Sequence, residues 1–210
     1  MGSTPTPPTR WEKHHTPDSW QAYADRFAQM HEGGDDLHGE ARFVDALCRR
    51  DAAVLDAGCG TGRVTEGLAD RGLTAVGVDK DPGLLAMARD RRPDLTWVEA
   101  DLAGIDPGDF SDAPFEVIVL AGNVMVFLAD GTERQVLANL TGLLEPGGRL
   151  VTGFATASSG FSRGNAYGVQ DLDRDCAEAG LEVQARYATW QMAPWREDSD
   201  WAVTVIGVPA

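Results

Sequence analysis

The chain contains the run Val54-Leu55-Asp56-Ala57-Gly58-Cys59-Gly60-Thr61-Gly62-Arg63-Val64. Its apolar residues predict a buried strand, its glycines a tight turn, and its last residues the first turn of a helix. In an open α/β sheet, nucleotide-like ligands bind where such a strand ends and the helix begins. The run therefore predicts an α/β domain with a ligand site at the carboxyl end of its first strand.

The spacing of the glycines separates two kinds of ligand. They stand at Gly58, Gly60 and Gly62, whereas a dinucleotide fingerprint places its third glycine at the position that Arg63 holds. Asp56 also puts a carboxylate where a dinucleotide site holds pyrophosphate, and a carboxylate repels phosphate and attracts an ammonium group. S-adenosylmethionine carries an ammonium and a sulfonium and no phosphate, so it fits this turn better than a nicotinamide dinucleotide does.

Size and composition exclude several classes of protein. A chain of 210 residues suffices for one α/β domain with a real core. Its net charge of −15 argues against a nucleic-acid substrate, because proteins that bind a phosphate backbone present a basic face. No apolar run reaches the ~20 residues of a membrane span, and the polar, proline-rich N-terminus does not resemble a secretory signal.

The cysteines and the other metal-ligating residues bear on compartment and metal binding. Cys48, Cys59 and Cys176 have neither paired nor metal-like spacing, which indicates free thiols in a reducing cytoplasm. No cluster of His, Asp or Glu has the spacing of a metal site. We therefore expect a cytoplasmic protein with no metal, no nucleic-acid partner and no membrane partner. The sequence leaves the oligomeric state open.

Strands and helices alternate after residue 50. Strands are predicted over 53–56, 74–79, 95–99, 115–121 and 149–154, with helices over 63–71, from Pro82 onward, over 132–144 and over 169–179. Segments 181–189 and 201–208 alternate like a closing antiparallel pair. The predicted fold is α/β, with a doubly wound, mostly parallel seven-stranded sheet, a C-terminal antiparallel strand pair and an N-terminal helical cap.

The same pattern predicts how the chain is divided. Residues 1–17 are expected to form a flexible arm, and residues 18–50 a helical cap with helices near 18–30 and 39–50. Residues 51–210 are expected to form the ligand-binding domain, so that 18–210 is a single globular unit.

Asp79 ends the second predicted strand, beside the glycine turn. A carboxylate at this place can accept hydrogen bonds from both hydroxyls of a ribose, although dinucleotide folds share that geometry. Lys80 follows, either beside an adenine ring or as a solvated lysine. Asp101 follows the third predicted strand and offers an acceptor for exocyclic N–H donors.

Together these features closely resemble the class I S-adenosylmethionine-dependent methyltransferases. The resemblance is strong over about residues 50–155. It rests on the glycine run, Asp79, Glu99-Ala100-Asp101-Leu102, Leu120-Ala121-Gly122-Asn123-Val124-Met125, and Leu143-Leu144-Glu145-Pro146-Gly147-Gly148-Arg149-Leu150. It implies S-adenosylmethionine as cofactor, S-adenosylhomocysteine as product, and a small-molecule methyl acceptor.

The resemblance also implies roles for particular residues. It assigns Asp101 to the adenine amino group and Leu102 to a neighbouring backbone contact. It places Ala121, Gly122 and Asn123 along the methionine moiety. The remaining cofactor-binding residues that it implies form the turn: Asp56, Ala57, Gly58, Cys59, Gly60 and Gly62.

Methyl transfer from a sulfonium is an in-line displacement that depends mainly on alignment and on excluding water. A general base helps only where the acceptor must lose a proton. All four histidines precede residue 50, and His31 and His38 are the better candidates because they flank Gly33-Gly34-Asp35-Asp36, a flexible stretch between two predicted helices. The alternative for both is an exposed or helix-capping histidine.

Other functions stay open beside a small-molecule methyltransferase. A protein that binds S-adenosylmethionine without catalysis, in a regulatory role, has the same turn. A nicotinamide-dependent oxidoreductase shares the fold but conflicts with Arg63 and Asp56. An aminopropyl transferase that uses the decarboxylated cofactor is a further alternative. The sequence leaves open the identity of the acceptor and whether O, N or C is methylated.

Overall fold

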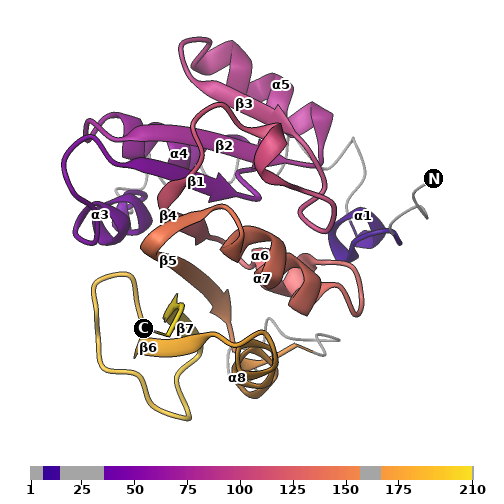
Figure 1. The fold of residues 1–210 in the computed structure, drawn as a ribbon, viewed down its shortest axis with the longest axis vertical. Helices are drawn as coiled ribbons and strands as arrows, with labels where there is room; N and C mark the ends of the chain where they lie inside the picture. The colour runs from indigo at the N-terminus through magenta and orange to yellow at the C-terminus, as the bar shows by residue number, and fades with distance from the viewer. Residues whose placement is uncertain (1–6, 15–35, 157–166, 210) are drawn as a thin grey trace.

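The structure, a computed structural model, describes residues 7–14, 36–156 and 167–209 (Figure 1). Within these ranges seven strands form one sheet in the order β3-β2-β1-β4-β5-β7-β6. The strands are β1 (Ala53–Ala57), β2 (Thr74–Asp79), β3 (Thr96–Glu99), β4 (Phe115–Leu120), β5 (Leu144–Ala155), β6 (Glu182–Tyr187) and β7 (Trp201–Gly207).

Strands β1 to β5 pair in parallel, and β7 runs antiparallel to both β5 and β6. From β1 the chain builds outward to β2 and β3, and then returns to add β4 and β5 on the other side of β1. This reversal leaves a crevice between the carboxyl ends of β1 and β4, where open α/β sheets bind their ligands. The predicted doubly wound, mostly parallel sheet with an antiparallel C-terminal pair is confirmed.

Helices cover both faces of the sheet (Figure 1). They are α1 (Arg10–His14), α3 (Gly39–Asp45), α4 (Arg63–Ala69), α5 (Pro82–Arg91), α6 (Val124–Phe127), α7 (Glu133–Thr141) and α8 (Val169–Glu178), with a 3-10 helix, η1, at Pro107–Asp109. Alternate residues of β4 face opposite sides: Val117 and Val119 pack with α3 and α4, and Ile118 and Leu120 with α7 and α8. None of the described helices is long and apolar enough to cross a membrane.

Element boundaries differ from the prediction in a few places. The helix expected near 18–30 lies outside the described residues, and the one expected over 39–50 ends at Asp45. Strand β5 begins at Leu144, five residues earlier than predicted, because Leu144 pairs with Phe115 before a shift in register resumes the ladder at Arg149. Residues 10–14 of the expected flexible arm form α1, which packs against α6.

The Trp97 ring of β3 packs against the glycine turn and against β2. A Cβ at Gly62 or at Gly77 of β2 would overlap the Trp97 indole ring, so both positions exclude any larger residue. The indole N–H donates to the Arg92 carbonyl at 2.9 Å, which fixes the ring between α5 and the sheet. The shape of the turn therefore depends on a side chain two strands away.

Replacing Trp97 with alanine should destabilise the protein, because the cavity left by the indole ring cannot be filled by two glycines. We expect the Trp97→Ala variant to lose about 3 kcal/mol of unfolding free energy, the range for large-to-small changes in a core. Urea denaturation followed by circular dichroism measures this loss. A variant as stable as the wild type would show that the ring does not support the turn.

Candidate cofactor-binding site

The glycine turn joins β1 to α4 with three left-handed residues. Gly58, Gly60 and Gly62 have φ angles of +78°, +55° and +88°, a region that side chains disfavour. The N–H groups of Gly58 and Cys59 both donate to the Val78 carbonyl, at 2.8 and 2.9 Å. These bonds hold the turn against the end of β2.

Two of these glycines leave space for different neighbours. A Cβ at Gly58 would lie 2.7 Å from Val124, so this glycine lets α6 approach the turn closely. A Cβ at Gly60 would meet nothing nearer than the Leu84 side chain at 4.0 Å. Because Gly60 lines a cavity, a side chain there would project into the space that the cavity provides.

A cavity of about 340 Å³ opens at the carboxyl ends of β1, β2 and β4. Seven of the predicted cofactor residues line it: Gly58, Gly60, Asp79, Lys80, Asp101, Leu102 and Gly122. They come from four separate stretches of the chain, which the parallel strands bring to one edge of the sheet. The cavity is therefore the candidate cofactor site.

Asp79 lies between the turn and the start of α5. Its carboxylate oxygens accept hydrogen bonds from the Gly60 N–H at 2.7 Å and the Asp81 N–H at 2.8 Å. Burial raises the pKa of Asp79 above its usual value, although these backbone bonds oppose the shift. Each carboxylate oxygen has a second lone pair, so Asp79 can also accept a ligand hydroxyl at each oxygen.

Asp101 sits across the cavity, after β3. One carboxylate oxygen accepts from the Ala103 N–H at 3.0 Å, and the other lies 3.2 Å from the Lys80 ammonium. The Leu102 carbonyl accepts from the Asn139 side chain at 3.0 Å, which ties this loop to α7. Asp79 and Asp101 are thus both held by backbone donors.

The other predicted cofactor residues are not among those that line the cavity. They are Asp56, Ala57, Cys59, Gly62, Ala121 and Asn123. Asp56 lies beneath the turn, 1% exposed, where one oxygen accepts from the N–H and hydroxyl of Thr65 at 3.0 and 2.7 Å. Asn123 accepts from the Ala155 N–H at 2.7 Å and so joins the ends of β4 and β5.

The buried carboxyl group of Asp56 makes stability depend on pH. Burial raises its pKa to about 6, against opposing hydrogen bonds from Thr65. Because the folded state binds this proton more tightly than the unfolded chain does, the group favours folding below pH ~4, and that advantage is lost as pH rises through about 6. We expect Asp56→Asn to remove about 3 kcal/mol of this pH-dependent change in unfolding free energy, measured by urea titrations from pH 4 to 7. Identical slopes in both proteins would contradict the assignment.

The structure describes only one of the two candidate catalytic histidines. His31 lies outside the described residues. His38 is exposed at the start of α3, with its ring nitrogen Nδ1 beside Gly67 of α4, and is not among the residues that line the cavity. Among the described residues, no group of three or more His, Cys, Asp or Glu side chains is placed to hold a metal ion.

Sequence reasoning missed most of the outer wall of the cavity, of which only Val124 lay in a stretch that it singled out; this wall is formed by Thr9, Trp11, Glu12, Val124, Phe127 and Leu128. The first three belong to α1 and the residue before it, and the others to α6 and its end. The tryptophan in the proline-rich arm and the Val-Met-Val-Phe run after β4 were the available signals, because large apolar side chains seldom stay in solvent.

Comparisons with known proteins agree with this geometry. A family model described as a methyltransferase domain matches residues 54–148. The crystal structure of a TehB-like SAM-dependent methyltransferase from Corynebacterium glutamicum is 34% identical, covers 92% of this chain and 100% of its own, and superposes with a TM-score of 0.82. The chain therefore belongs to the S-adenosylmethionine-dependent methyltransferase family.

Curated relatives match over a shorter stretch. A demethylmenaquinone methyltransferase from Renibacterium salmoninarum is 31% identical over 98 residues, 47% of this chain and 39% of that protein. A trans-aconitate 2-methyltransferase from Azoarcus sp. is 39% identical over 101 residues, 47% of this chain and 37% of that protein. The matched stretch thus spans less than half the length of these relatives.

Proposed function

We propose that this protein transfers a methyl group from S-adenosylmethionine to a small-molecule acceptor. The observation that carries the proposal is the cavity at the carboxyl edge of the sheet, where the open Gly60 position faces two fixed carboxylates, Asp79 and Asp101. An adenosine has two ribose hydroxyls and one amino group to donate, and these carboxylates offer matching acceptors.

Different residues of the cavity bind different parts of the cofactor. Asp79 accepts from the ribose hydroxyls, and Asp101 with the backbone of Leu102 binds the adenine. The backbone at Gly58, Gly60 and Gly122 approaches the methionine part. Asp56 acts from beneath the turn, where its buried negative charge favours a cation in the low-dielectric surroundings.

S-adenosylmethionine, when bound, supplies a methyl group on a positively charged sulfur. The protein's contribution is to align the acceptor with that methyl group and to exclude water. A histidine base remains a separate proposal for His31 and His38. It would matter only for an acceptor that loses a proton during transfer.

We infer a small, non-polymeric acceptor in the cytoplasm. The acidic balance of the chain, −15 overall, disfavours nucleic acid, and the cysteines Cys48, Cys59 and Cys176 are free, as in a reducing compartment. The relatives named above methylate a demethylmenaquinone and trans-aconitate, which are both small molecules.

An assay for S-adenosylhomocysteine tests the proposal. The protein is incubated with S-adenosylmethionine and fractions of a metabolite library that include quinols, carboxylic acids and amino sugars, and the product is measured by mass spectrometry. We expect one class of fraction to raise product formation above the rate without acceptor. A protein that binds S-adenosylhomocysteine tightly yet forms none with any fraction would instead be a binding or regulatory protein.

A further inference from the structure

Helix α1 forms part of the wall of the cofactor cavity, although its residues lie 40 or more positions before the glycine turn. Thr9, Trp11 and Glu12 line the cavity, and Arg10 points to the opposite side. We propose that α1 completes the adenosine end of the site and that Glu12 is a positioning residue, which orients Asp101 through Lys80. This inference rests on the proposed function.

The first support is the way α1 is anchored. The Arg10 guanidinium lies 2.8 Å from both Asp130 and Glu133, and the Arg10 and Glu133 side chains are only 14% and 8% exposed. The Arg10 N–H donates to the Leu128 carbonyl at 3.4 Å. A largely buried arginine that pairs with a buried carboxylate, here Glu133, holds its partner more firmly than a surface ion pair does. One side of α1 is therefore fixed to the segment between α6 and α7.

The second support is an aromatic contact across the cavity wall. The Trp11 ring meets Phe127 of α6 edge to face, with centroids 5.4 Å apart and planes at 82°. Both rings line the cavity. Such a pair adds to the area it buries and gives the site an apolar surface suited to the face of a purine ring.

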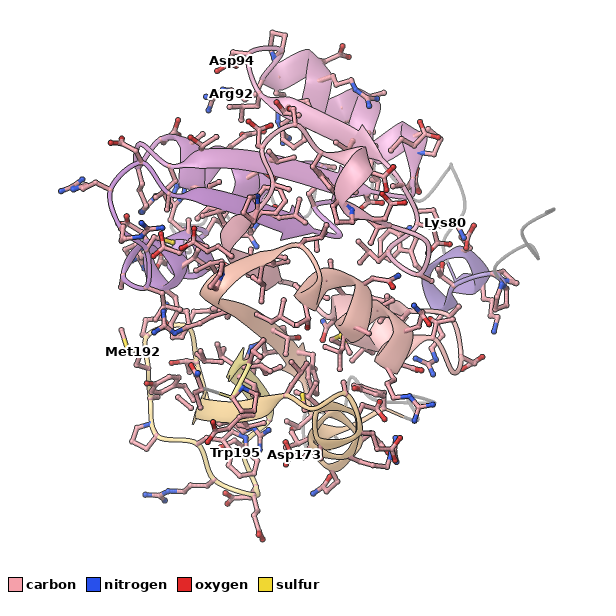
Figure 2. The ribbon with its side chains drawn as sticks, in the orientation of Figure 1. Lys80, Arg92, Asp94, Asp173, Met192 and Trp195 are labelled. Carbon is pink, nitrogen blue, oxygen red and sulfur yellow. The ribbon has the colours of Figure 1, made fainter. Side chains whose placement is uncertain are left out.

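The third support is a chain of charges from α1 to Asp101. The Lys80 ammonium lies 2.9 Å from the Glu12 carboxylate and 3.2 Å from Asp101 (Figure 2 shows Lys80 beside α1). Glu12 is itself held by the N–H and the hydroxyl of Thr9, at 2.7 and 2.8 Å. Lys80 thus bridges Glu12 to the Asp101 oxygen that does not bond to Ala103, so the position of Glu12 bears on how that oxygen is presented to the cavity.

The protonation states agree with this arrangement. Partial burial would lower the pKa of Lys80, but its hydrogen bonds to Glu12 and Asp101 raise it above the usual value. Partial burial would raise the pKa of Glu12, but Lys80 and Thr9 lower it. Glu12 and Lys80 thus form an ion pair at neutral pH. Beside them, Asp101 presents an acceptor to the purine 6-position.

Selectivity for that position provides a test that a merely structural role would not affect. S-adenosylhomocysteine carries an amino group there and S-inosylhomocysteine a carbonyl oxygen, so a fixed Asp101 carboxylate binds the first and repels the second. We expect wild type to prefer the adenosyl ligand at least thirtyfold in calorimetric titrations. We expect Glu12→Gln to reduce that preference at least threefold and to release S-adenosylhomocysteine at least threefold faster in stopped-flow experiments.

Two further variants serve as positive and negative controls for the effect of Glu12→Gln. Asp101→Asn can donate to a carbonyl oxygen, so it should reduce the preference more than Glu12→Gln does. Glu182→Gln removes the same charge from an exposed position of β6, at the far edge of the sheet, and should leave preference and release unchanged. If wild type binds S-adenosylhomocysteine and Glu12→Gln behaves like Glu182→Gln, the positioning role is overturned while the proposed function stands. If wild type binds neither ligand, both fail.

Discussion

The Gly60→Val variant is expected to fold and to show no detectable binding of S-adenosylhomocysteine. Gly60 has a φ of +55° and lines the cavity, and its Cβ direction is open apart from Leu84 at 4.0 Å. A valine side chain would occupy space that the ligand needs. It would also strain the backbone, at a cost of about 1–3 kcal/mol, which most folded domains tolerate.

Gly147→Val is the matched control for that backbone strain. Gly147 has a φ of +84°, is exposed, and has nothing within 4 Å of the position of a Cβ. It does not line the cavity, so the control should lose stability but retain wild-type affinity. Normal affinity in a folded Gly60→Val protein would show that the turn does not contact the ligand.

Asp79→Ala should bind S-adenosylhomocysteine at least tenfold more weakly than wild type. The substitution removes the acceptors for two charge-assisted hydrogen bonds from ribose hydroxyls. It also removes the bond to the Gly60 N–H, at 2.7 Å, that fixes the glycine turn. Isothermal titration calorimetry measures the affinity directly.

Asp106→Ala provides the comparison for Asp79→Ala. Asp106 is exposed and likewise accepts backbone N–H bonds, from Gly108 at 2.7 Å, but it lies outside the cavity. It should therefore bind S-adenosylhomocysteine as wild type does. Equal affinities for all three proteins would remove Asp79 from the ribose role.

The glycines and acids that line the cavity could be predicted from the sequence, because their positions depend on the local turn and on the ends of the strands. Gly58 and Gly60 need their turn conformation whatever surrounds them, and Asp79 and Asp101 end strands whose carboxyl ends must share an edge in a parallel sheet. These features needed no knowledge of distant contacts.

The outer wall could not be predicted, because distant contacts stabilise it. Residues 10–14 have no apolar periodicity, and α1 is held by Lys80, Asp130 and Glu133, which lie 68, 120 and 123 positions beyond the α1 residues that they contact. Side-chain direction was a second difficulty. Asp56 and Asn123 were predicted cofactor contacts; each bonds to the protein, to Thr65 and to Ala155, and neither lines the cavity, so their roles toward the cofactor stay predictions.

Calorimetric titration of the wild-type protein, with S-adenosylhomocysteine in one experiment and NAD⁺ in the other, tests the central claim most directly. The cavity with Asp79 and Asp101, and the buried carboxyl group of Asp56 beneath the glycine turn, predict saturable binding of S-adenosylhomocysteine and no binding of NAD⁺. Saturable binding of NAD⁺, with none of S-adenosylhomocysteine, would contradict it.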